Sequence, residues 1–368
     1  MGDEEKIKSH ECVKVIEGKR MFEPKFTITH TITNALLEIE RARGFLDAAN
    51  LNEEWITEMQ SEALILEAHH STHIEGTQLT LAQAQDILAG KSLKGIRKDD
   101  RQELLNYKEA MDFVSGYLGK ESEITEELLK EIHRILVEDV RGGTLEPGRY
   151  RTVQNYVVNS LTGTIIYTPP PPSQVPHLMT EFVEWLNKES DISPVLIAGI
   201  CQYQFVHIHP FLDGNGRTAR VLCSLILYLN GYDFKRLFSL SEYYDTNRRK
   251  YYDAIQSVRE NEMDMTTWLE YFTEGLSNQL AEVKAKGEKA IKRDVLHEII
   301  RDFYLNPRQK EALNFLIEHK QIDNSTYQKI CETTKRTATR DLTDLVNREL
   351  LERHGEKKGT YYTLKLFE

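Results

Sequence analysis

Helical periodicity runs through most of the sequence and restricts the fold more than any other feature. Apolar residues recur every three or four positions, as at Trp55, Met59, Ala63 and Leu66, which is the spacing of one helix face. The same texture predicts helices over 28–43, 51–71, 80–88, 101–118, 125–137, 175–187, 194–206, 214–230, 246–260 and 266–286. We therefore expect a mainly α protein.

Two short β-branched runs interrupt the helical texture. Residues 155–159 (NYVVN) and 164–168 (TIIYT) are joined by 160–163, which ends in a glycine, and this pattern predicts a β-hairpin. Four consecutive prolines at 169–172 follow. Because proline has no N–H to donate to a strand ladder, the prolines end the hairpin.

The C-terminal 63 residues have a pattern of their own. Helical segments at 308–319, 324–331 and 337–348 are followed by strand-like segments at 349–354 and 361–366. This is the order of a winged helix-turn-helix. A polar, lysine-rich stretch at 283–294 precedes this region, and its pattern predicts a solvated linking helix. The predicted divisions are 1–100, 101–275 with the hairpin at 150–170, a linker helix at 276–305, and 306–368.

Composition excludes several classes of protein. The net charge of -11 argues against nucleic-acid binding by the whole surface. Cys12, Cys201, Cys223 and Cys331 are widely spaced, which argues against a disulfide framework or a zinc ribbon and fits a reducing compartment. No stretch reaches about 18 apolar residues, and the N-terminus lacks the apolar segment of a signal peptide. We therefore expect a cytoplasmic protein that does not contact a membrane.

The densest group of chemically active residues is HIHPFLDGNGRTAR, from His207 to Arg220. Glycines around Asn215 allow successive backbone N–H groups to form an anion nest, and the following helix adds its positive end. Arg217 and Arg220 lie one helical turn apart and offer planar forks for phosphate oxygens. A phosphate ester is the expected ligand. No Walker motif occurs in the sequence.

An acid and a base precede the nest. Asp213 could hold Mg²⁺ against phosphates, and His209 could act as a general base near neutral pH. A helix-capping loop with a surface salt bridge is the alternative interpretation, and it would be preferred for an isolated Gly-Asn-Gly. The presence of base, acid, nest and two arginines in one order favours the phosphate site.

The segment His209–Arg220 resembles the HPFx[DE]GNGRxxR motif of Fic (fido) domain protein adenylyltransferases, with every fixed position matched. The resemblance extends over about 104–275. It implies a Fic-type helical core in which the hairpin is a flap over the active site. It also implies transfer of AMP from ATP, the substrate, to a Ser, Thr or Tyr hydroxyl of a target protein or of the chain itself. Pyrophosphate is released, and Mg²⁺ is the cofactor.

The resemblance also assigns roles within the motif. His209 is the catalytic base, and Asp213 is the metal ligand. The residues expected at the nucleotide are Gly214, Asn215, Gly216, Arg217, Thr218, Ala219 and Arg220, with Tyr252 and then Tyr251 at the nucleoside. His207 is not a fixed residue of the motif and is expected to pack or hydrogen-bond beneath the loop.

A second segment, Ser71 to Gly76 (STHIEG), resembles the [ST]xxxE[GN] inhibitory motif found in many Fic proteins. By this resemblance, Ser71 and Glu75 are inhibitory residues on N-terminal helices, and Glu75 pairs with Arg220. The γ-phosphate of ATP would then lose its guanidinium, and Pα would be badly presented for attack. The alternative interpretation is that Glu75 is only a solvated charge at the end of a helix. Glu75 could instead support removal of AMP from a modified target.

The hairpin is expected to hold an extended target segment along a strand edge. Val157, Val158, Ile165 and Ile166 are the residues assigned to this docking. A hairpin with only a structural role is the alternative.

Three histidines lie close to the inhibitory segment. His69 and His73 are four residues apart, as in some zinc sites, but no HExxH motif or distant third ligand accompanies them. Polar packing on a helix face is therefore preferred for His69, His70 and His73.

The C-terminal region leaves two functions open. Residues 306–368 contain 12 Lys or Arg and 10 Asp or Glu, and Lys335, Arg336 and Arg340 cluster where a recognition helix would begin. DNA binding is one interpretation. Protein contact is preferred, because a nearly neutral domain binds DNA weakly. A DNA-binding regulator with a nucleotide-sensing Fic domain remains a competing function. A homodimer through helical faces is the expected assembly.

Overall fold

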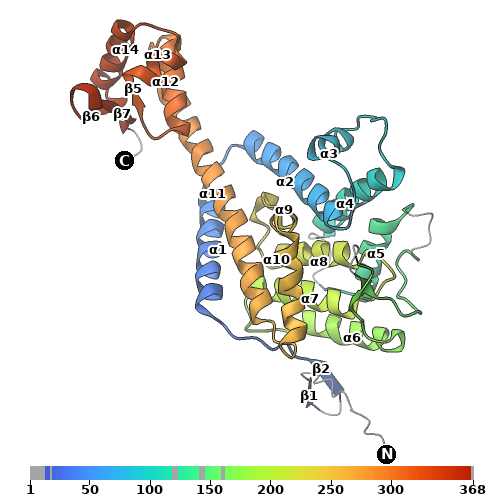
Figure 1. Cartoon of the computed structure of the whole chain (residues 1–368). Helices are drawn as coiled ribbons and strands as arrows, with labels where there is room; N and C mark the ends of the chain where they lie inside the picture. The colour runs from blue at the N-terminus through green and yellow to red at the C-terminus, as the bar shows by residue number, and fades with distance from the viewer. Residues whose placement is uncertain (1–12, 17–18, 118–122, 141–145, 159–161, 366–368) are drawn as a thin grey trace, which may run out of the picture. The chain divides into compact units, whose positions relative to one another are not determined.

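The computed structural model describes residues 13–16, 19–117, 123–140, 146–158 and 162–365, and most of them are helical (Figure 1). The predicted mainly α class is confirmed. The described chain divides into two units. One holds residues up to Asp47 together with Thr57–Ala281, and the other holds Ala48–Ile56 together with the chain from Glu282. The four predicted divisions stay predictions.

Most of the predicted helices begin and end close to their expected positions. Thr80 and Thr125 cap two of them by accepting hydrogen bonds from backbone N–H groups, and Thr80 forms a full capping box with Gln83. The first eleven helices are α1 (His30–Ala48), α2 (Glu53–Ile74), α3 (Leu81–Leu88), α4 (Lys98–Tyr117), α5 (Glu126–Val137), α6 (Val175–Leu186), α7 (Pro194–Ile208), α8 (Asn215–Leu229), α9 (Leu240–Thr246), α10 (Arg248–Glu260) and α11 (Thr266–Asp302).

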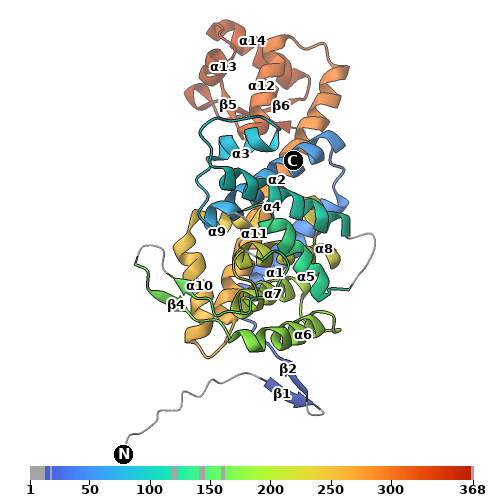
Figure 2. The same cartoon turned by 90° about the vertical axis from the view of Figure 1, so that its right-hand side faces the viewer.

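Helices α7 and α8 form the centre of the first unit. They pack against each other, α6 lies beside α7, and α4 and α5 pack on α8 (Figure 2). Apolar residues cover all sides of α7, and Val195, Ile200 and Phe205 are fully buried. A helix that is apolar all round belongs in a core. Cys201 and Cys223 are buried free thiols, whereas Cys12 lies outside the described residues.

The structure differs from the sequence prediction in two helices. The helix predicted over 246–260 is preceded by a separate helix, α9, and the break falls at Asn247, whose side chain caps α10. The helix predicted over 266–286 and the predicted linker are one helix, α11. The lysine-rich stretch contains no proline, and its single Gly287 does not end the helix.

The hairpin is present but short. Strands β3 (Val157–Val158) and β4 (Ile165–Tyr167) pair antiparallel with a bulge. Residue 159, predicted to end the first strand, and residues 160–161 of the predicted connection lie outside the described residues. A second antiparallel pair, β1 (Val13–Ile16) and β2 (Lys19–Phe22), was not predicted.

The second unit has the predicted order of three helices followed by two strands. They are α12 (Pro307–Glu318), α13 (Asn324–Ile330), α14 (Lys335–Asn347), β6 (Leu351–His354) and β7 (Tyr361–Leu364). A short unpredicted strand, β5 (Ile322–Asp323), completes an antiparallel sheet of order β5-β7-β6. The helices pack around Leu313 and Leu342. Among the described residues of both units, none of the helices combines the length and apolarity needed to cross a membrane.

Candidate active site

The candidate site is the loop between α7 and α8. His209 ends α7 in the left-handed region, with φ 52°, and Gly214 begins α8 with φ 76°. A Cβ atom at Gly214 would lie 2.8 Å from Cγ1 of Val137. Glycine is therefore required at this position both by the backbone conformation and by the close packing of α5.

Side chains of α8 hold the loop from within. Asn215 accepts a hydrogen bond from the Phe211 N–H and donates one to the Phe211 carbonyl, each at 2.9 Å. Thr218 donates both its N–H and its hydroxyl to the Gly214 carbonyl at 2.9 Å. These side chains are occupied in stabilising the loop. The N–H groups of the first helical turn have no carbonyl partner within the helix, so they are the groups available to bind an anion here.

Two residues that the sequence analysis did not identify brace the loop from outside. Arg151 is buried and donates to the carbonyls of His209 at 2.8 Å and Pro170 at 2.5 Å. The His133 ring stacks on Phe211 with 3.7 Å between centroids. Its Nε2 lies 3.0 Å from the Asp213 carbonyl, to which it donates. Neither pairing has a local sequence signal, because the partners are tens of residues apart.

His209 has the geometry and charge state of a base. Its Nδ1 lies 3.2 Å from the Val206 carbonyl. That nitrogen must carry the proton it donates, so Nε2 is left with a lone pair. Burial lowers the pKa of His209 to about 4. The ring is therefore neutral at pH 7 and able to accept a proton.

Asp213 and Arg217 differ sharply in exposure. The Arg217 side chain is fully buried, with Nη1 3.0 Å from Oε2 of Glu103 and Nη2 3.8 Å from Oδ1 of Asp213. The Asp213 carboxylate is partly exposed beside the nest and suits Mg²⁺, which binds proteins through one or two carboxylates plus substrate phosphates. The described residues include no group of three acidic, histidine or cysteine side chains that could hold a metal alone.

Arg220 is tied to the predicted inhibitory segment. Its Nη2 lies 2.8 Å from Oε1 of Glu75 and donates to the Ser71 carbonyl at 2.9 Å, while Nε donates to Ser71 Oγ at 2.7 Å. Burial opposes the charge on Arg220, but the Glu75 carboxylate outweighs it and raises the pKa of Arg220. A Cβ atom at Gly216 would lie 2.3 Å from Oε1 of Glu75. The carboxylate therefore rests directly on the start of α8, where anions bind well.

The two tyrosines predicted at the nucleoside have different surroundings. Tyr251 is buried and stacks on Tyr244 at 4.4 Å. Tyr252 is 49% exposed, with its ring 5.3 Å from that of Tyr251. Of the pair, Tyr252 has the free surface that a ligand could contact.

The flap exposes apolar side chains next to the loop. Val158, Ile165 and Ile166 are exposed, whereas Val157 is partly buried. At the end of β4, the Tyr167 hydroxyl donates to the His207 carbonyl at 2.8 Å and lies 2.9 Å from His207 Nδ1. His207 is thus hydrogen-bonded to the flap, in line with the packing role predicted for it.

Comparison with known proteins identifies the domain. Residues 123–227 match the sequence model of the Fic/DOC family. The chain is 34% identical over 200 residues to a protein named protein adenylyltransferase Fic from Drosophila willistoni, covering 54% of this chain and 38% of that one. It is 32% identical over 240 residues to the Culex quinquefasciatus protein of the same name, covering 64% and 45%. The chain thus spans less than half the length of these relatives.

Solved structures share the fold. A Fic family protein from Desulfovibrio desulfuricans G20 matches with a TM-score of 0.61 and 22% identity, over 94% of this chain and 99% of that one. Fic-1 from C. elegans matches with a TM-score of 0.59 and 26% identity, over 72% and 73%. The loop, the helices around it and the sequence match all fall in one region, and the chain therefore contains a domain of the Fic/DOC family.

Proposed function

We propose that the chain is a protein adenylyltransferase restrained by its own Glu75. The observation that carries this proposal is the Glu75 carboxylate, 2.8 Å from Arg220 and in contact with Gly216. A carboxylate at that point takes the place that a phosphate would take at the helix start. ATP that binds alongside Glu75 would be displaced from its productive position, and a displacement of about 1 Å can cost on the order of a hundredfold in rate.

The chain's residues suit transfer of AMP to a hydroxyl. Nε2 of His209 takes the proton from a Ser, Thr or Tyr hydroxyl while its oxygen bonds to Pα. The bond from Pα to the bridging oxygen breaks, and pyrophosphate leaves with the electron pair. The first N–H groups of α8 and the Arg220 guanidinium stabilise the phosphate charge. Mg²⁺ bound by Asp213 would neutralise part of that charge.

Three preparations test the proposal with α-phosphate-labelled ATP and Mg²⁺: wild type, Glu75→Gly, and Glu75→Gly combined with His209→Ala. We expect label on protein to rise in the single variant and to disappear in the double variant. If no preparation is labelled although ATP binds, the proposal is wrong.

Two other functions each have a supporting observation. The Glu75 side chain is 29% exposed, so it could orient a water that removes AMP from a modified target. Release of AMP from labelled protein, lost in Glu75→Gly, would favour that reaction. The start of α14 exposes Lys335, Arg336 and Arg340, as DNA contact through a winged helix would need. A salt-dependent shift of duplex DNA that survives His209→Ala would favour a regulator.

Location and assembly are proposed from the sequence alone. We propose a cytoplasmic protein that forms a homodimer through helical faces, and a mass measurement in solution tests the dimer.

A further inference from the structure

The inhibitory carboxylate lies just beyond the end of its helix. Helix α2 ends at Ile74, and Glu75 and Gly76 form a turn in which the Gly76 N–H donates to the His73 carbonyl at 3.0 Å. Gly76 has φ 106°. Helix ends fray, so the helix alone does not fix Glu75 on Arg220.

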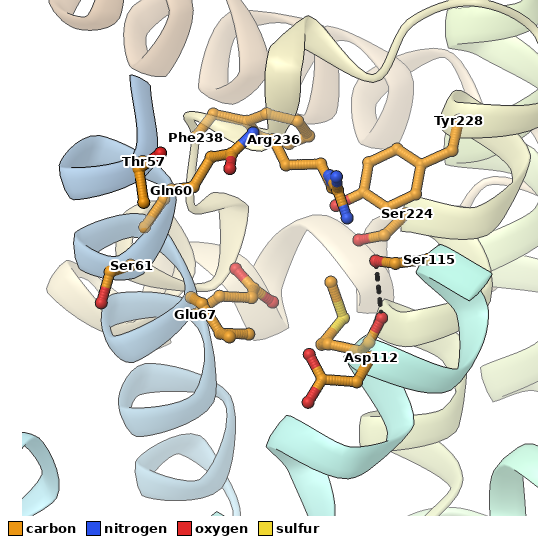
Figure 3. A pocket seen from close by; sticks show the side chains of 13 residues that line it. Thr57, Gln60, Ser61, Glu67, Asp112, Ser115, Ser224, Tyr228, Arg236 and Phe238 are labelled. Carbon is orange, nitrogen blue, oxygen red and sulfur yellow. Dashed lines mark hydrogen bonds between the residues drawn. The ribbon is translucent and has the colours of Figure 1, made fainter. Parts of the chain in front are cut away.

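Packing behind α2 leaves a gap further along the helix. A cavity of about 300 Å³ is lined by Ser61 and Leu64 of α2, by Ser115 of α4 and by Ser224 and Tyr228 of α8 (Figure 3). The buried Glu67 carboxylate ties the helix to neighbouring elements there. It accepts hydrogen bonds from the Tyr107 hydroxyl, the Ser239 hydroxyl and the Ser241 N–H at 2.9, 3.0 and 2.9 Å. A polar anchor therefore helps to hold this helix beside the cavity.

A second polar anchor lies next to the inhibitory turn itself. Asp245, in the last turn of α9, has a side chain that is only 5% exposed. Its Oδ2 lies 2.8 Å from Nδ1 of His70 and 2.7 Å from Nδ1 of His73, and its Oδ1 accepts from Nε of Arg248 at 2.5 Å. His70 and His73 flank Ser71 and precede Glu75, so one carboxylate holds the chain on both sides of Ser71.

Asp245 stays charged over the physiological range. Burial opposes its charge, but hydrogen bonds from His70, His73 and Arg248 outweigh burial and lower the pKa of Asp245 to about 2. Nη2 of Arg248 also lies 2.6 Å from Nδ1 of His73. Removal of the carboxylate would take away the acceptor that His70, His73 and Arg248 share, so α2 and the start of α10 would lose the group that joins them.

The same anchor reaches the predicted nucleoside side of the site. Arg248 is the first residue of α10, and Tyr251 and Tyr252 follow one turn later on that helix. The anchor is therefore formed by residues from the inhibitory turn and from the start of α10.

We propose that Asp245 is a positioning residue that latches the inhibitory turn of α2 onto α9 and α10 and so keeps Glu75 on Arg220. This inference depends on the proposed function, in which Glu75 restrains AMP transfer. Asp245 contacts neither the expected ATP nor the target, and it acts only through Glu75.

The test measures protein labelling by α-phosphate-labelled ATP in four full-length preparations: wild type, Asp245→Asn, Glu75→Gly and the double variant. We expect Asp245→Asn to raise labelling about tenfold, less than Glu75→Gly, because the carboxylate is loosened and not removed. In the Glu75→Gly background the same substitution should add nothing. A residue that only supports the fold would lower labelling in both backgrounds, so this non-additivity separates the two roles.

Two further variants complete the design. Asp264→Asn is the matched control, because Asp264 also accepts from a neighbouring N–H and hydroxyl, those of Thr266, but lies before α11 away from the turn; its labelling should equal wild type. His70→Gln with His73→Gln removes the latch from the α2 side, and it decides the outcome if Asp245→Asn unfolds.

The experiment distinguishes a failure of the role proposed for Asp245 from a failure of the proposed function. Labelling that rises in Glu75→Gly but stays at the wild-type level when the latch is removed from either side would overturn the role of Asp245 alone. No labelling in Glu75→Gly would overturn the proposed function and the latch together.

Discussion

The loop from His209 to Gly216 and the turn from Ser71 to Gly76 meet at Arg220 but are held in opposite ways. Buried side chains from other elements bind the loop carbonyls: Arg151 binds that of His209, and His133 binds that of Asp213. The Glu75 side chain is partly exposed, and it is held by an ion pair with Arg220 while it rests against Gly216. The bonds that brace the loop do not involve Glu75, so loss of Glu75 leaves them in place.

The largest expected effect comes from the base in the rigid loop. His209→Ala in the Glu75→Gly background should lower the labelling rate by about 10²–10⁴-fold, the usual contribution of a general base. The loop should keep its shape, because its bracing bonds do not use the His209 side chain, so ATP affinity should change little. Labelling rates and ATP titrations check this, and a rate that is retained would assign the base to another residue.

The bracing of the loop can be broken from outside the motif. Arg151→Met should leave buried carbonyls of His209 and Pro170 unpaired, and a misplacement of about 1 Å costs on the order of a hundredfold in rate. We expect that loss in the turnover rate measured in the Glu75→Gly background. Arg149→Met, at an exposed arginine two residues earlier, is the matched control and should have no effect. Equal rates for the two variants would mean that the loop does not need its brace.

A smaller effect is expected where the two regions touch. A methyl group at Gly216 would lie 2.3 Å from Oε1 of Glu75, so Gly216→Ala should expel the carboxylate. The methyl group would also cover the N–H groups that bind phosphate, so ATP affinity should fall about tenfold, equivalent to roughly 1.4 kcal/mol. Unlike Glu75→Gly, this variant should gain no labelling. Calorimetric titration with ATP measures the affinity, and strong activation would show that the nest does not bind phosphate.

The same contrast explains what the sequence could predict. Helix positions follow from local periodicity, and the loop residues are consecutive in the chain, so both could be predicted from the sequence. The partner expected for Glu75, Arg220, came from a resemblance and not from spacing. Arg151, His133, Glu103 and Asp245 were not identified, because each acts on a partner far away in the sequence. Helix α9 was missed, since a seven-residue helix shows too few turns for its periodicity to stand out.

The smallest expected effect is that of pH on the labelling rate, which depends on His209 in the rigid loop. The pKa of His209 lies at about 4, below the ordinary value of 6.5, because the ring is buried. Its neutral form is therefore complete at both pH 8 and pH 6, and the labelling rate of Glu75→Gly should change less than about twofold between them. A base at the ordinary value would lose about three quarters of its neutral form at pH 6, so a roughly fourfold fall would contradict a buried base.

As pH falls, the free energy of unfolding should decrease before His209 becomes protonated in the folded protein. The pKa values of His69, His133 and His209 are lowered to about 4 and that of His207 to about 3, in each case chiefly by burial. Below pH 6.5 the unfolded chain takes up protons that the folded chain refuses, so the free energy of unfolding falls as pH drops from 6.5 toward 4. Urea unfolding at pH 7 and 5 measures the loss. His209 begins the loop and His133 braces it from α5, so acid should loosen this rigid region through its folding equilibrium while its chemistry at pH 6 stays intact.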